Sequence, residues 1–309
     1  MTNIAALPQE QQERPRKLAD LLDPDFMARL DQLDVVSRKI FAGKLKGERR
    51  SKRRGTSVEF ADYRNYVVGD DLRFIDWNIY GRLERLFLKL FLEEEDLCLH
   101  VAVDTSASMD TGEPLKSWAA RRIAAALGYI GLVNYNRVTV TMFSEQIVGQ
   151  ATNLRGRHRL EQMGRLLIET PDEGGSDLVG MARHVALTRQ GKGVMIVISD
   201  FLAKTGYEQA LRYLAGNRYD VYVLQLLSPQ EVNPPLTGDL KLIDVEDLDV
   251  SEITVSAPLL KRYKANLESF CGGLREFCTR RGMMYLFATS DTPFDKLVLN
   301  YLRRRGLLK

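Results

Sequence analysis

Oxygen-bearing side chains gather in the segment Asp104-Thr105-Ser106-Ala107-Ser108, which follows a run of apolar residues. One carboxylate and two hydroxyls stand at alternate positions, so three oxygen atoms can face the same side of a tight loop. Such hard oxygens suit Mg²⁺, or Mn²⁺ in its place, and they suit zinc or copper poorly. The spacing indicates a site for a divalent cation, although Asp and Ser also follow strands simply because they cap helices.

Two further segments carry the same kinds of oxygen ligand. Gly174-Gly175-Ser176-Asp177 enters a predicted helix, and Ser199-Asp200 ends a predicted strand. If these segments lie at the same edge of a sheet as the first loop, their side chains converge on one point. The candidate metal ligands are Asp104, Ser106, Ser108, Ser176 and Asp200.

Regular alternation of strands and helices has to position these loops. Apolar runs predict strands at 97–103, 137–143, 146–152, 193–198 and 220–227. Helical periodicity predicts helices at 117–134, 158–169, 178–189 and 207–215. Near-continuous apolar strands separated by helices are typical of an α/β fold, in which a doubly wound, mostly parallel sheet is covered on both faces. Ligands bind such sheets at the carboxyl ends of the strands.

The C-terminal part departs from this alternation before returning to it. Apolar and acidic residues alternate around an Asp-rich turn, which predicts a hairpin insertion near 236–256. A long helix is expected from Pro258 to Gly282, followed by a strand at 283–289 and a terminal helix. We therefore expect residues 96–309 to form one domain.

The N-terminal part is predicted to contain four segments. Residues 1–24 read as a flexible tail, and apolar spacing predicts a helix over about 25–43. Residues 44–54 hold seven Lys or Arg against one acid, which predicts an exposed basic arm. Short aromatic and β-branched runs then predict a β-rich extension up to residue 95. Within it, Arg73 is expected to pair with an acid and Trp77 to cover an apolar surface, as a structural clamp rather than a catalytic group.

Composition narrows the class of protein. The 309 residues are 45% hydrophobic and 28% charged, with a formal net charge of +3, as in ordinary globular proteins. The three cysteines lack a C-x-x-C spacing, so neither a disulfide framework nor a zinc site is indicated. No run has the length and apolar character of a signal peptide or a membrane span, so we expect a cytoplasmic protein.

The three oxygen-rich segments, DTSAS, GGSD and ISD, resemble the metal-ion-dependent adhesion site of the von Willebrand factor A fold. In that resemblance Asp104, Ser106 and Ser108 match the D-x-S-x-S motif, Ser176 takes the place of the usual Thr, and Asp200 matches the last Asp. Ser176 keeps the hydroxyl and lacks only the methyl group. The resemblance implies a bound Mg²⁺ or Mn²⁺ that grips an acidic side chain of a partner protein, with Asp200 acting through water.

A second resemblance covers the segment before this domain. The block from Arg64 to Trp77, R-x-Y-x-x-G-D-D-x-R-x-I-D-W, is similar to the signature of a bacterial "domain of unknown function" family numbered fifty-eight. Members of that family resemble partners of MoxR-type AAA+ ATPases, which implies an adaptor or co-chaperone. Many members carry membrane helices, and this sequence departs from them by showing none.

Two other functional classes remain as alternatives. A Mg²⁺-dependent phosphohydrolase of the phosphoaspartyl type also has an Asp after its first strand, but it needs a general acid two residues later, where this chain has Ser106. The basic arm could bind nucleic acid through its phosphates, although it lacks interleaved aromatic residues. Without a P-loop, a G-x-G-x-x-G turn or a G-x-S-x-G elbow, the sequence favours a binding module over an enzyme.

Overall fold

The structure is a computed structural model that describes residues 17–35, 59–92, 97–188, 193–216, 219–243, 250–293, 296–303 and 306–308. The chain divides into two compact units. Residues 1–45 and 96–309 belong to the large unit, and residues 46–95 belong to the small unit. The basic arm predicted at 44–54 lies outside the described residues.

A six-stranded sheet forms the centre of the large unit, in the order β10-β7-β6-β3-β4-β5. Its strands are β3 (Cys98–Asp104), β4 (Arg137–Phe143), β5 (Ile147–Leu154), β6 (Gly193–Ser199), β7 (Tyr219–Leu227) and β10 (Met284–Thr289). All neighbouring pairs are parallel except β4 and β5, which pair antiparallel. Numbered from the first strand of the sheet, the order is the 3-2-1-4-5-6 of doubly wound folds, which confirms the predicted α/β class.

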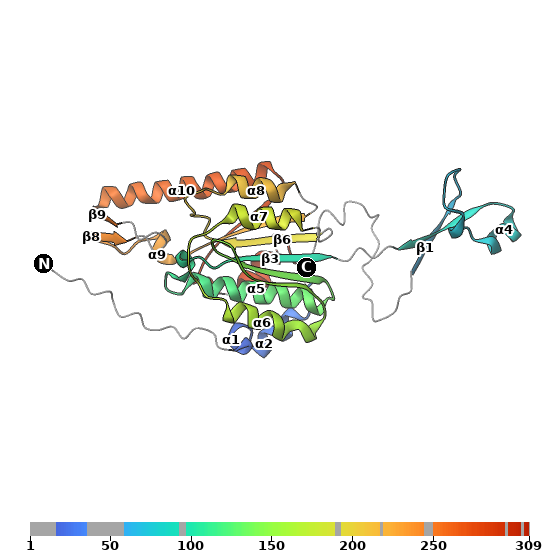
Figure 1. Cartoon of the computed structure of the whole chain (residues 1–309), viewed down its shortest axis with the longest axis horizontal. Helices are drawn as coiled ribbons and strands as arrows, with labels where there is room; N and C mark the ends of the chain where they lie inside the picture. Colours follow the sequence, from blue (N-terminus) through green and yellow to red (C-terminus); the bar gives the residue numbers. More distant parts are fainter. Residues whose placement is uncertain are drawn as a thin grey trace. The chain divides into compact units, whose positions relative to one another are not determined.

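Helices cover both faces of this sheet (Figure 1). One face carries α1 (Leu18–Leu21), α2 (Pro24–Leu30), α5 (Lys116–Val133) and α6 (Leu160–Glu169), and the other carries α7 (Leu178–Leu187), α8 (Glu208–Ala215) and α10 (Ala257–Arg280). Because successive residues of a strand point to opposite faces, β3 contributes to both cores. Leu99 and Val101 pack in the core under α5, whereas Cys98 and Ala102 pack in the core under α7 and α8. This burial on both sides explains why the strands read as continuous apolar runs.

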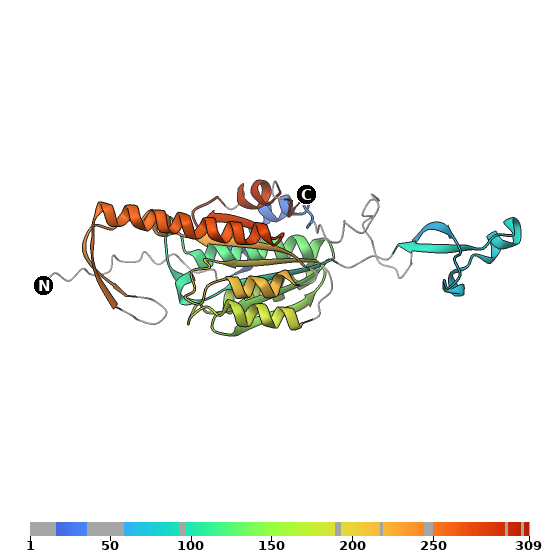
Figure 2. The same cartoon turned by 90° about the horizontal axis from the view of Figure 1, so that it is seen from above.

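The alternating stretch near 236–256 forms two antiparallel strands, β8 (Gly238–Ile243) and β9 (Val250–Val255). The short helix α9 (Pro229–Val232) precedes them, and α10 follows them. Figures 1 and 2 both show α10 extending past the sheet, with β8 and β9 at its projecting end. The remaining short elements of the large unit are the 3-10 turns η2 (Ala107–Asp110) and η3 (Arg157–Arg159) and the π-helical turn η4 (Lys296–Leu302).

The N-terminal segment differs from the expectation in two places. Of the helix expected over 25–43, α2 ends at Leu30, and Val35 forms a β-bridge to Leu308 instead of continuing a helix. Residues 36–43 lie outside the described residues. Leu33 and Val35 are buried in the core of the large unit, so their apolar character reflects this packing. The flexible tail expected over 1–24 also ends earlier, since α1 begins at Leu18 and Leu21 is fully buried.

The small unit is built on an antiparallel pair of strands, β1 (Glu59–Asn65) and β2 (Phe87–Leu92), as its β-rich sequence predicts. Between them lie a 3-10 turn, η1 (Leu72–Phe74), and a helix, α4 (Trp77–Leu83). Asp76 caps α4 by accepting hydrogen bonds from the backbone of Asn78 at 2.9 Å and Ile79 at 3.2 Å. Among the helices of the described ranges, none in either unit has the length and apolar character needed to cross a membrane.

In the small unit the expected pairing of Arg73 with an acid is confirmed, and the expected burial of Trp77 against an apolar surface is wrong. That this block holds the hairpin to the domain stays a prediction. Arg73 donates from Nε and Nη2 to both carboxylate oxygens of Asp71, as expected for a bidentate pair. Trp77 is 62% exposed and meets Tyr80 edge to face. Trp77 is the first residue of α4, directly after the capping residue Asp76, and none of the seven residues of α4 is buried.

Candidate functional site

Backbone hydrogen bonds bring the predicted loops together at the carboxyl end of β3. The amide of Thr105 donates to the carbonyl oxygen of Phe143 at the end of β4, at 2.8 Å. The amide of Ala107 donates to Gly174 at 2.9 Å, and the amide of Glu173 donates back to Thr105 at 2.9 Å. The loop after β3 is thus tied both to the end of β4 and to the loop that precedes α7.

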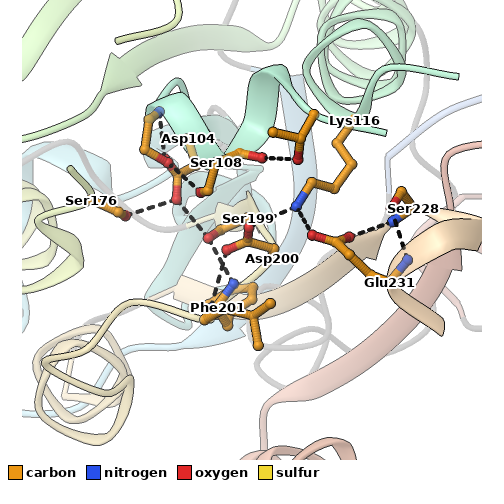
Figure 3. Close-up of polar contacts among 12 residues, drawn as sticks. Asp104, Ser108, Lys116, Ser176, Ser199, Asp200, Phe201, Ser228 and Glu231 are labelled. Atoms are coloured by element: carbon orange, nitrogen blue, oxygen red, sulfur yellow. Dashed lines mark hydrogen bonds and ion pairs between the residues drawn. The ribbon is translucent and has the colours of Figure 1, made fainter. Parts of the chain in front are cut away.

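Asp104 stands at the centre of this arrangement, fully buried (Figure 3). Its Oδ1 accepts hydrogen bonds from the backbone amide of Ser106 at 3.0 Å and from the hydroxyl of Ser106 at 2.7 Å. Its Oδ2 accepts from the hydroxyls of Ser176 at 2.8 Å and Ser199 at 2.7 Å. The Ser106 hydroxyl lies 3.1 Å from that of Ser108. Four of the five candidate ligands therefore converge, and their role in holding a metal stays a prediction.

The fifth candidate, Asp200, faces a different partner. Its Oδ2 accepts a hydrogen bond from Lys116 Nζ at 2.9 Å, and its Oδ1 accepts one from the amide of Leu202 at 3.1 Å. The next residue, Phe201, is buried with a φ of 61°, which is strained for a bulky side chain. Its amide donates to the Ser199 hydroxyl at 2.9 Å, so the strained turn holds the hydroxyl that reaches Asp104.

Burial and a second carboxylate shape the electrostatics of Asp104. Burial, and to a smaller extent the nearby charge of Asp200, raises the pKa of Asp104 to about 6, against the opposing effect of the hydrogen bonds from Ser199 and Ser106. The hydroxyls that surround Asp104 are neutral donors. Ionised Asp104 is thus a buried negative charge that a nearby cation would stabilise.

The donor set fits a hard divalent cation. Among the residues that the structure describes, no three His, Cys, Asp or Glu side chains gather as a metal centre, so serine hydroxyls would supply most of the ligands. The Asp104 carboxylate with the hydroxyls of Ser106, Ser108 and Ser176 offers oxygen atoms from two loops, which is the chemistry that Mg²⁺ and Mn²⁺ prefer. The residues around the site carry more negative than positive charge. The carboxylates are those of Asp104, Asp200 and the partly buried Glu231, and the ammonium is that of Lys116.

Three residues of the site were not among the candidates from the sequence. Ser199 was recognised as part of an oxygen-rich loop, but its hydrogen bond to Asp104 depends on the Phe201 turn. Glu231 could have been noticed through its S-x-x-E capping box with Ser228. Lys116 carries no such signal, because lysine at the start of a helix is ordinarily exposed.

Comparison with known proteins places the chain among uncharacterized bacterial relatives. An uncharacterized protein of Mycobacterium bovis is 26% identical over 296 residues, covering 94% of this chain and 93% of the relative. An uncharacterized protein of Mycobacterium tuberculosis matches with the same identity and coverage.

Similar solved structures include a conserved hypothetical protein, BatB, from Bacteroides thetaiotaomicron, with a TM-score of 0.41 and 14% identity over 68% of this chain and 98% of that chain. The pilus adhesin SpaC from Lactobacillus rhamnosus GG has a TM-score of 0.42 and 13% identity over 70% of this chain and 31% of that chain. The sequence model of the family described as "Protein of unknown function DUF58" matches residues 62–270, which is more than half of the 309 residues. The chain therefore belongs to the DUF58 family.

Proposed function

We propose that this protein is a metal-dependent protein-interaction module, not an enzyme, in which Asp104, Ser106, Ser108 and Ser176 hold Mg²⁺ or Mn²⁺. The observation that carries the proposal is the convergence of hydroxyls from separate loops on the buried carboxylate of Asp104. In this proposal Asp200 supports the ion through water, as the resemblance to the adhesion site implies.

The charge of the ligands explains how such a site would bind a partner. Mg²⁺ prefers six oxygen ligands and keeps several waters when the protein supplies few of them. Asp104 would contribute one negative charge, and the serine hydroxyls would contribute none. The bound ion would therefore stay net positive and attract a carboxylate from an acidic side chain of the partner protein.

The partner we propose is a MoxR-type AAA+ ATPase, or a client protein that such an ATPase remodels, with this chain as an adaptor or co-chaperone in the cytoplasm. Membership in the DUF58 family supports this choice, because that family resembles partners of these ATPases. The Arg64 to Trp77 block belongs to the same resemblance and lies within the matched residues.

The Asp104→Ala variant tests the proposal. Calorimetry should detect Mg²⁺ binding to the wild-type protein and none to the variant, which lacks the central ligand. A pull-down with a MoxR-type AAA+ ATPase from the same genome should recover the wild type in Mg²⁺, and should fail both for the variant and for the wild type in EDTA.

Asp177→Asn is the matched control. Asp177 follows Ser176 and caps α7 by accepting a hydrogen bond from Gly180 at 2.8 Å, a role that Asn can also fill. The control loses the same charge at the same edge of the sheet and should bind metal and ATPase like the wild type. Full ATPase binding by Asp104→Ala, or by the wild type in EDTA, would show that the interaction does not use this site.

A further inference from the structure

A lysine side chain is enclosed beside the candidate metal site. Lys116 is the first residue of α5, and its side chain is 0% exposed. Its ammonium donates to Asp200 Oδ2 at 2.9 Å and also pairs with Glu231 (Figure 3). Two carboxylates thus pair with this one ammonium, which keeps the buried positive charge of Lys116 compensated.

The other end of this ion-pair network is anchored away from the site. Glu231 Oε2 accepts a hydrogen bond from the amide of Ser228 at 2.6 Å, and the Glu231 carbonyl oxygen accepts one from the hydroxyl of Tyr263 on α10 at 2.7 Å. Gln230, the preceding residue, exchanges two hydrogen bonds with the backbone of Glu113, just before α5. These contacts hold Glu231, and through it the ammonium of Lys116, in one position.

Asp200 therefore lies between a positively charged residue, Lys116, and a negatively charged one, Asp104. On one side Lys116 neutralises it. On the other side Asp200 directly follows Ser199, whose hydroxyl donates at 2.7 Å to Asp104, the central candidate ligand. A cation bound at Asp104 would meet both the attraction of Asp200 and the repulsion of Lys116, and in a buried site each unit of charge has a large effect.

We propose that Lys116 is a built-in cation that weakens the binding of Mg²⁺ at Asp104 and leaves the bound ion with more positive charge for a partner's carboxylate. This inference rests on the proposed function, because it concerns the same metal site. By pairing with Asp200, Lys116 neutralises a negative charge that would otherwise help to stabilise the bound cation. As a consequence, the site should bind Mg²⁺ weakly in the absence of a partner. A carboxylate from an acidic partner should then raise the affinity for Mg²⁺ more than it would at a site with two free carboxylates.

Opposite charge changes at two residues provide the test, with Mg²⁺ alone as the probe in calorimetry of the full chain. Lys116→Met removes the positive charge and keeps an unbranched side chain, so Mg²⁺ should bind at least about tenfold more tightly. Glu231→Gln removes a negative charge from the partly exposed end of the network and should weaken Mg²⁺ binding several-fold. Lys89→Met, which breaks the ion pair with Asp76 in the small unit, is the matched control and should bind like the wild type.

The outcomes separate this inference from the proposed function. If the wild type binds Mg²⁺ and Asp104→Ala does not, but Lys116→Met binds no more tightly than the wild type, the role assigned to Lys116 is wrong while the metal site stands. If wild-type binding is too weak to measure and Lys116→Met binds measurably, the inference is supported. Binding by none of these proteins overturns both proposals. Should Lys116→Met fail to fold, Glu231→Gln decides alone, and unchanged or tighter binding overturns the inference.

Discussion

At the scale of single residues, His100 shows what burial does to a titratable group outside the candidate site. It lies in the middle of β3, 1% exposed, with Nε2 2.9 Å from the Thr141 hydroxyl and Nδ1 without a hydrogen-bond partner among the described residues. Burial, and to a smaller extent the charge of His184, lowers the pKa of His100 to about 3. The folded protein therefore keeps this imidazole neutral at physiological pH.

The stability of the protein should consequently depend on pH through His100. The unfolded chain takes up a proton at this residue below its ordinary pKa of 6.5, whereas the folded chain does not until about 3. The contribution is fully present above pH 6.5 and is lost as the pH falls, at up to about 1.4 kcal/mol per pH unit. Denaturant unfolding of the wild type and of His100→Gln from pH 8 to pH 5 measures this contribution of His100 to the free energy of unfolding.

The difference in unfolding free energy between these two proteins should be constant above pH 7.5 and should shift in favour of His100→Gln as the pH falls. A difference that stays constant down to pH 5 would show that His100 takes up a proton as readily in the folded protein as in the unfolded chain. Other titrating groups cancel in this comparison, because both proteins contain them.

At the scale of elements, the close pairing of β3 with β6 aligns the strand ends that carry Asp104 and Ser199. The register begins with Cys98 opposite Gly193, at the other end of both strands. A Cβ atom at Gly193 would lie 1.9 Å from the carbonyl oxygen of Cys98, so only glycine allows the strands to approach as they do. This contact is between backbones and cannot be relieved by a side-chain rotation.

Gly193→Ala should therefore lower the free energy of unfolding by about 1–3 kcal/mol, the usual range for an overpacked interior. Gly272→Ala is the matched control, since Gly272 lies within α10 with nothing within 4 Å of the added Cβ. Removing a glycine from a helix interior should raise stability by up to about 1 kcal/mol. Thermal melts of the two variants should shift in opposite directions, and equal shifts would contradict the close approach of β3 and β6.

At the scale of the whole molecule, the chain forms two compact units rather than one. In the small unit several large apolar side chains are exposed, among them Val68 at 93% and Trp77 at 62%. The large unit holds both buried clusters that sandwich its sheet. Each unit is compact through its own internal contacts, and we expect a change at an exposed residue of the small unit to leave the unfolding of the large unit unaltered.

Trp77→Ala tests this independence. Exposed positions away from special contacts usually change stability by less than about 0.5 kcal/mol, so the main thermal transition should stay within the error of the wild type. Phe26→Ala, which removes a ring that is 1% exposed in the large unit, is the positive control and should cost about 3–5 kcal/mol. A comparable loss in Trp77→Ala would mean that the indole is buried in the intact protein.

The sequence by itself determined most of the large unit and the centre of the site. Apolar runs and helical periods predict the strands and helices because each pattern reflects which sides of an element are buried. The oxygen-rich loop from Asp104 to Ser108 could be placed at the carboxyl edge because it directly follows a buried strand. These predictions need only the order of residue types along the chain, without any knowledge of contacts between distant residues.

Only the tertiary structure decided which distant residues meet at the site. Lys116 is 84 positions from Asp200 and 115 positions from Glu231, and nothing in its neighbourhood along the chain distinguishes it from an exposed lysine. The early end of α2 and the exposure of Trp77 were decided in the same way, by what each segment packs against. The physical reason is that the burial and pairing of a charged side chain depend on the whole fold around it. The periodicity of the sequence indicates only whether a segment is a helix or a strand and which of its faces is buried.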